Sequence, residues 1–150
     1  MMPVKILLVN GPNLNRLGHR APDIYGRKTL PEIEALVRQR GAELGVEVLC
    51  FQSNSEGAIV DFLQAEGPRA SGVIINPGAL THYGLSLRDA LTDLGLPVAE
   101  VHISNIYARE DWRHHSVIAP IAKGQISGFG WRGYIAALEL LVEPLQGPVI

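Results

Sequence analysis

The sequence predicts an α/β domain in which a parallel sheet lies between two layers of helices. Short apolar runs rich in β-branched residues alternate along the whole chain with longer segments of helical spacing. The apolar runs are nearly continuous, as expected for strands that are buried on both faces. Strands that alternate with helices and are covered on both faces form parallel sheets between helices.

Each element follows from its pattern and its boundaries. The expected strands cover residues 4–9, 46–51, 72–75, 97–103 and 125–129. The expected helices cover residues 29–44, 55–66, 81–94 and 131 to about 145. Two helix starts have the spacing of a capping box, Thr29 with Glu32 and Ser53 with Glu56. We expect residues 1–150 to form one three-layer, flavodoxin-like domain with a five-stranded parallel sheet.

The composition excludes several classes of function. The 150 residues are 47% hydrophobic, and their formal net charge of -2 includes basic residues that are scattered singly. We therefore expect no nucleic-acid partner and no membrane partner, whereas the composition is compatible with a small-molecule ligand. Cys50 is the single cysteine, which excludes disulfides within the chain and thiolate metal clusters. The apolar run near the N-terminus is too short for a signal peptide or a membrane span, so a cytoplasmic protein is expected.

Polar residues gather where the expected strands end. The loop at residues 10–28 is rich in Asn, Arg, Gly and Pro, and loops of this length in compact domains are usually functional or disordered. In parallel α/β sheets the ligand crevice lies beyond the carboxyl ends of the strands. Further polar segments follow the other strands at residues 52–56, 76–82, 102–105 and 109–115.

Two side chains at this end could transfer protons. Tyr25 follows Arg20 by five residues, and nearby cations favour a phenolate that can act as a base. Taken alone, however, a tyrosine is more often a packed ring whose hydroxyl bonds a backbone carbonyl. Glu100 and His102 project from the same face of a strand, where the carboxylate can orient and charge the imidazole for general-acid catalysis. A hydrogen-bonded core histidine explains that pair equally well.

Other positions fit binding better than chemistry. His82 stands at an expected helix start beside Thr81, a possible cap, and Asp89 is an expected helix-surface residue that could reach a neighbouring subunit. Residues 76–79 and 103–105 could offer backbone N–H groups to an anion. The histidines lack zinc-ligand spacing, phosphate-binding loop motifs are absent, and no lysine lies in a strand centre. We expect no metal, no cofactor and no Schiff base.

Six motifs occur in order along nearly the whole chain. They are NGPNLN at 10–15, GxRxPxxYG at 18–26, FQSNSEG at 51–57, INPGA at 75–79, EVHISN at 100–105 and RHHS at 113–116. Together they resemble the type II 3-dehydroquinate dehydratases. The resemblance implies a cofactor-free trans dehydration of 3-dehydroquinate to 3-dehydroshikimate through an enolate, in the shikimate pathway of aromatic amino-acid biosynthesis.

The resemblance also implies residue roles. Tyr25 would remove the C2 proton and Arg20, on a mobile lid, would sustain its phenolate. Asn13 would stabilise the enolate through a water, and His102, beside Glu100, would protonate the departing C1 hydroxyl. The implied substrate-binding residues are Asn76, His82, Asp89, Ile103, Ser104 and Arg113. A homododecamer built as a tetramer of trimers is implied, with Asp89 reaching into a neighbour's site.

The chain departs from the family pattern at a few positions. Ala21 stands where the family commonly has Glu, Arg16 replaces an apolar residue, and Asp111 with Trp112 replaces a common Pro-Phe pair. These departures affect the lid and the approach to Arg113. Two rival interpretations stay open: a non-catalytic flavodoxin-like module that binds a small polyol or carboxylate, and a scaffolding oligomer without a ligand.

Overall fold

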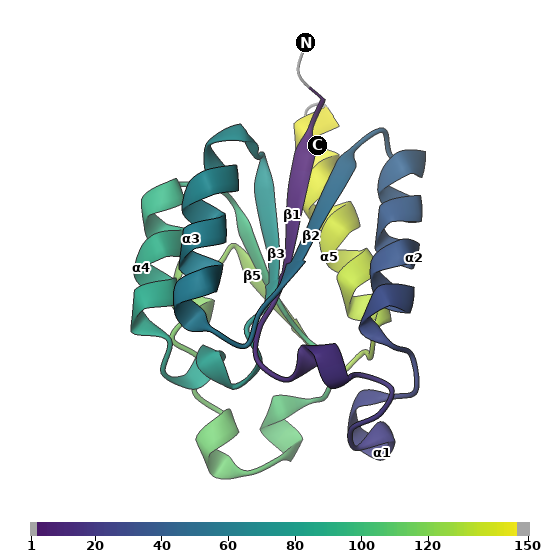
Figure 1. Ribbon diagram of the computed structural model, residues 1–150, viewed down its shortest axis with the longest axis vertical. Coiled ribbons are helices and arrows are strands. Elements are labelled where there is room, and N and C mark those ends of the chain that lie inside the picture. The colour runs from purple at the N-terminus through teal and green to yellow at the C-terminus, as the bar shows by residue number, and fades with distance from the viewer. Residues whose placement is uncertain (1–2, 147–150) are drawn as a thin grey trace.

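The computed structural model describes residues 3–146, which form three layers with a parallel sheet in the middle (Figure 1). The strands are β1 (Lys5–Asn10), β2 (Glu47–Gln52), β3 (Gly72–Asn76), β4 (Val98–His102) and β5 (Gly124–Ser127). They pair in the order β2-β1-β3-β4-β5, and every pairing is parallel. This strand order is that of flavodoxin-like domains, so the predicted fold class is confirmed.

Four helices cover the two faces of the sheet. They are α2 (Leu30–Glu43), α3 (Glu56–Glu66), α4 (Leu85–Leu94) and α5 (Arg132–Val142). In Figure 1, α3 and α4 lie side by side on one face, and α2 and α5 cover the other. The short helix α1 (Pro22–Tyr25) interrupts the long loop after β1. The 3-10 turns are η1 (Leu14–Arg16), η2 (Gly67–Arg69), η3 (Gly78–His82), η4 (Ile106–Ala108), η5 (Asp111–Arg113), η6 (Ala119–Ile121) and η7 (Glu143–Gln146).

The central strand β1 explains why the apolar runs are continuous. Its Ile6 and Leu8 enter the apolar cluster beneath α2 and α5, whereas Leu7 and Val9 enter the cluster beneath α3 and α4. All four side chains are fully buried. Successive residues of a strand point to opposite faces, so a strand covered on both faces needs apolar residues at every position.

One predicted capping box is confirmed and the other is wrong. The Thr29 hydroxyl accepts a hydrogen bond from the Glu32 amide at 3.3 Å, and the Glu32 carboxylate accepts one from the Thr29 amide. The next helix is instead capped by Ser55, whose hydroxyl accepts the Ala58 amide at 3.3 Å. Ser53 lies before that helix and accepts the amide of Ser55.

The start of the third predicted helix also differs. Residues Gly78–His82 form η3, and α4 begins only at Leu85. Thr81 therefore does not cap α4. The carboxylate of Glu56 instead accepts the Leu87 amide at 3.0 Å, so the first turn of α3 supplies the cap of its neighbour. Within residues 3–146, no helix has the length and apolar character needed to cross a membrane.

Candidate active site

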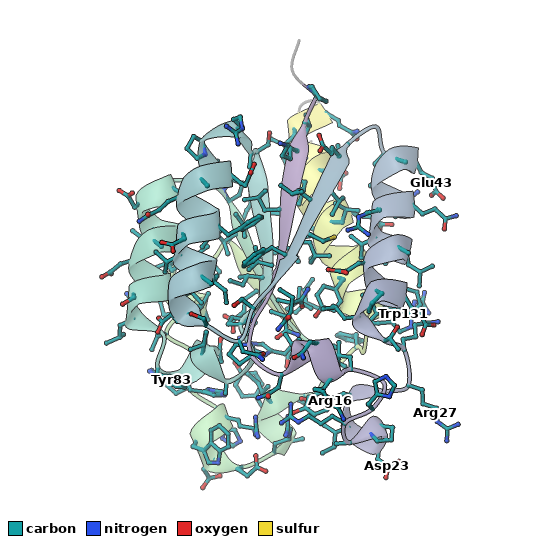
Figure 2. The ribbon with its side chains drawn as sticks, viewed as in Figure 1. Arg16, Asp23, Arg27, Glu43, Tyr83 and Trp131 are labelled. Carbon is teal, nitrogen blue, oxygen red and sulfur yellow. The ribbon has the colours of Figure 1, made fainter. Side chains whose placement is uncertain are left out.

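All but one of the predicted site residues meet at the carboxyl ends of β1, β3 and β4. A cavity of about 200 Å³ opens there, and it is lined by residues from the long first loop, from η3 and from the segment after β4. Figure 2 shows the side chains of Arg16, Asp23 and Arg27 at this end of the molecule and Glu43 at the opposite end. A larger hollow of about 500 Å³ shares Tyr25 and Ser104 with this cavity, but neither His102 nor Asn76 lines it.

Nine of the predicted site residues line the cavity. They are Asn13, Arg20, Tyr25, Asn76, His82, His102, Ile103, Ser104 and Arg113. Glu100 lies behind His102 and is fully buried. Asp89 is exposed on α4 and does not line the cavity. Within residues 3–146, no three His, Cys, Asp or Glu side chains are grouped as a metal site.

Glu100 is the centre of a buried hydrogen-bond network. Its Oε2 lies 2.5 Å from His102 Nε2 and accepts from the Thr81 hydroxyl at 2.5 Å. Its Oε1 accepts from the Ser116 hydroxyl at 2.9 Å. Burial alone would raise the pKa of Glu100, but the bonds from these three partners together lower the pKa below its ordinary value. An ionised carboxylate can only accept a hydrogen bond, so the proton of this bond lies on Nε2 of His102.

Two arginines lie close to the ring of Tyr25. The Cζ atom of Arg20 is 5.0 Å from the centre of the tyrosine ring, and that of Arg109 is 5.2 Å away. Arg109 Nη1 also donates to Tyr25 Oη at 2.9 Å and to Ser104 Oγ at 3.0 Å. The tyrosine hydroxyl thus meets a guanidinium instead of the backbone carbonyl that the packing alternative expected, although the ring does pack against the apolar cluster beneath α2 and α5. The hydrogen bond between Arg109 and Tyr25 is therefore charge-assisted.

Sequence reasoning did not select Arg109 as a site residue. It lies in the polar segment that follows β4, a segment that was expected to reach the crevice. Its contact with Tyr25 spans 84 positions of the chain, so no local spacing connects the two. The short helix α1 brings Tyr25 to this contact, and its first turn starts at Pro22 after Ala21 in a left-handed conformation with φ 41°.

The side chain of Asn76 is hydrogen-bonded to a fully buried tyrosine, Tyr134. Its Nδ2 donates to Tyr134 Oη at 2.9 Å, and that hydroxyl donates to Asn10 Oδ1 at 2.6 Å. Asn76 Oδ1 accepts the Gly78 amide at 3.1 Å. Burial raises the pKa of Tyr134, so its hydroxyl keeps the proton that it donates. The tyrosine on α5 therefore ties together the ends of β1 and β3.

His82 and Arg113 present different hydrogen-bonding groups to the cavity. His82 Nδ1 lies 2.7 Å from the carbonyl oxygen of His115, which requires a proton on Nδ1. Burial lowers the pKa of His82, so the neutral ring offers Nε2 as an acceptor. Arg113 supplies a cation and stacks on Trp112, with Cζ 4.0 Å from the ring centre. The Trp112 ring also meets His82 edge-on, at 5.3 Å between centroids.

Known proteins are similar to this chain in sequence and in fold. The model of the family described as "Dehydroquinase class II" matches residues 4–142. The chain belongs to the class II dehydroquinase family. The resemblance that was drawn from six short motifs is therefore confirmed.

Relatives of this dehydroquinase-family chain align over nearly its whole length. The 3-dehydroquinate dehydratase of Roseiflexus castenholzii is 61% identical over 146 residues, which are 97% of this chain and 93% of the relative. That of Herpetosiphon aurantiacus is 53% identical over 140 residues, covering 93% and 97% of the two chains. The crystal structure of the type II dehydroquinase from Propionibacterium acnes superposes with a TM-score of 0.90 at 44% identity, covering 94% and 97%.

Proposed function

We propose that this chain catalyses the cofactor-free trans dehydration of 3-dehydroquinate to 3-dehydroshikimate, a step of the shikimate pathway. The observation that carries the proposal is the pair of groups in one cavity. Tyr25 has its hydroxyl on the Arg109 guanidinium, and His102 has its imidazole on the buried Glu100 carboxylate. A base stabilised by cations and an acid charged by a carboxylate are the two groups that this elimination needs.

Tyr25 is the base in this proposal. Its phenolate removes the proton at C2, next to the C3 ketone, and the electron pair of the broken C–H bond moves to the ketone oxygen. Arg20 and Arg109 stabilise the phenolate before the step. Asn13, acting through a water, holds the enolate oxygen that forms. Preorganised donors at a developing oxyanion are usually a large contribution to catalysis.

His102 is the acid. The enolate electrons return to form the C1–C2 double bond, the C1–O bond breaks, and His102 gives its proton to the departing hydroxyl, which leaves as water. Glu100 remains a carboxylate and stabilises the charged imidazole before the transfer. No lysine lines the described cavity, so nothing in this wall is placed to form an imine with the ketone.

The remaining residues would bind and orient the substrate. The proposal assigns the substrate carboxylate to the amides of Ile103 and Ser104, and the hydroxyl groups to Asn76, His82 and Arg113. The neutral His82 ring supports this assignment because it can accept a hydrogen bond from a hydroxyl group. Asp89 would enter the site of a neighbouring subunit in a homododecamer, a state that light scattering can test. The proposed enzyme is one catalytic domain, 1–150, located in the cytoplasm.

The test is a continuous ultraviolet assay of the purified protein with 3-dehydroquinate, which follows the conjugated enone of 3-dehydroshikimate. The assay is repeated after borohydride treatment in the presence of substrate. Activity that survives borohydride supports the enolate mechanism, and loss of activity would point to an imine and overturn the role of Tyr25. A folded protein without turnover would favour the non-catalytic binding module.

His102→Ala should also lose activity, and a wild-type rate would remove His102 as the acid.

A further inference from the structure

The end of β2 holds the turn that carries Asn13. Asn54 Oδ1 accepts the backbone amide of Asn13 at 2.9 Å. The same oxygen accepts from Gln52 Nε2 at 3.2 Å, and Gln52 Nε2 also donates to the carbonyl of Gly11 at 3.2 Å. Two neighbouring polar side chains therefore contact both ends of the turn at 11–13. The proposed reaction gives neither of them a role.

The backbone of Asn13 is in the left-handed region, with φ 71° and ψ -3°. Residues with a β-carbon are uncommon there, although asparagine adopts this region more readily than most. Such conformations persist where the surrounding structure fixes them. The turn is also pressed against the loop after β3, because a β-carbon at Gly11 would lie 2.4 Å from the carbonyl oxygen of Pro77. A small rotation at Asn13 would therefore redirect its side chain within a closely confined turn.

We propose that Asn54, held by Gln52, is a positioning residue that fixes the left-handed backbone of Asn13 and thereby aims the Asn13 carboxamide at the enolate. The inference rests on the proposed dehydratase reaction. Asn54 acts through its acceptor oxygen alone, since Oδ1 receives both hydrogen bonds and Nδ2 makes none with protein groups within residues 3–146. An aspartate at position 54 keeps that acceptor and should therefore keep the function.

Purely structural stabilisation would give a different pattern of variants. Ser55 provides the comparison, because its hydroxyl makes one hydrogen bond to a backbone amide, as the cap of α3, and Ser55 does not line the cavity. If Asn54 only stabilises the loop, Asn54→Ala and Ser55→Ala should both lower Tm and leave kcat unchanged. If Asn54 positions Asn13, only Asn54→Ala should lower kcat.

The experiment measures kcat, KM and Tm with 3-dehydroquinate for the wild type and for Asn54→Ala, Asn54→Asp and Ser55→Ala. We expect Asn54→Ala to lower kcat about tenfold, because one hydrogen bond that sets the geometry of a reacting group is lost. KM should stay within about threefold, since ground-state binding does not depend on the enolate contact. Asn54→Asp should return kcat to within about twofold of the wild type, and Ser55→Ala should keep the wild-type kcat.

The outcomes separate this inference from the proposed function. A wild-type protein without turnover refutes the dehydratase reaction itself. An active wild type with an equally active Asn54→Ala variant refutes only the positioning role. An Asn54→Asp variant as slow as Asn54→Ala would also overturn it, because the acceptor oxygen would then not be the group that matters. Gln52→Met removes the donor that holds Asn54, and it should lower kcat by a smaller factor.

Discussion

Replacing Glu100 by glutamine tests the buried network most directly. The change keeps the size of the side chain but removes a fully buried charge that accepts hydrogen bonds from three side chains. The new amide offers one acceptor oxygen, which can take the place of Oε2 and face the donors of His102 and Thr81 at 2.5 Å each. Its NH2 group then takes the place of Oε1, where it cannot accept the bond that the Ser116 hydroxyl donates at 2.9 Å.

The loss of stability follows from those contacts. A hydrogen bond to a charged group contributes about 1.5–3 kcal/mol, and removing one partner of a buried ion pair costs about 3–5 kcal/mol. We therefore expect Glu100→Gln to lower the free energy of unfolding at pH 7 by about 3 kcal/mol, which for a chain of this size lowers Tm by roughly 6–12 °C. Thr81→Val removes one donor only and should lower the free energy of unfolding by less.

The pH dependence has a definite sign. The pKa of Glu100 in the folded protein lies below its ordinary value of 4.5, so between these two values the unfolded chain binds a proton that the folded chain does not. The stabilisation is complete above pH 4.5 and is lost as the pH falls through the lower, folded pKa. Glutamine does not titrate, so the stability difference between the two proteins should shrink as the pH falls below 4.5.

Urea unfolding followed by tryptophan fluorescence, at a series of pH values, measures both quantities for the wild type and for Glu100→Gln. Two results would refute the reasoning. One is an unchanged unfolding free energy at pH 7. The other is a stability difference that stays constant from neutral pH to well below 4.5, because Glu100 would then not be held as a carboxylate.

Three further changes have expected outcomes. Tyr25→Phe should abolish turnover and leave ligand affinity, measured by calorimetry, within about an order of magnitude, since it removes one hydroxyl; unchanged activity would exclude the proposed base. Gly11→Ala should lower both Tm and activity, because the new β-carbon would lie 2.4 Å from Pro77 O, and a normal Tm would contradict that close approach. Tyr134→Phe leaves Asn76 without its buried partner, and urea unfolding should show a loss of about 1–3 kcal/mol, with a raised KM; an unchanged KM would separate this tyrosine from substrate binding.

Local patterns predicted the sheet well because its strands are buried on both faces. β1 and β3 carry apolar residues at nearly every position, and no other element type suits such short β-branched runs between helices. The capping box at Thr29 could also be predicted, because Thr29 and Glu32 are only three residues apart and no distant residue takes part. The crevice followed from topology, because parallel strands end at the same edge of the sheet.

Tertiary demands decided the features that the sequence did not predict. Ser53 and Ser55 are both plausible caps, and the choice between them depends on Glu56, whose carboxylate is drawn away to the first turn of α4. Thr81 has the local context of a cap, but a buried carboxylate 19 positions away binds its hydroxyl instead. The role of Arg109 depends in the same way on a tyrosine 84 positions distant.

The hydroxyl of Tyr134 has a consequence for the order in which the chain can mature. It forms hydrogen bonds with Asn10, which is 124 positions earlier in the sequence, and with Asn76, which is 58 positions earlier. The helix α5 therefore completes a site whose other parts lie earlier in the sequence. During synthesis, β1 and β3 leave the ribosome long before α5 does, and contacts of such long range form late. A nascent chain can therefore build most of its sheet early, but it gains a supported Asn76 only when the C-terminal helix docks.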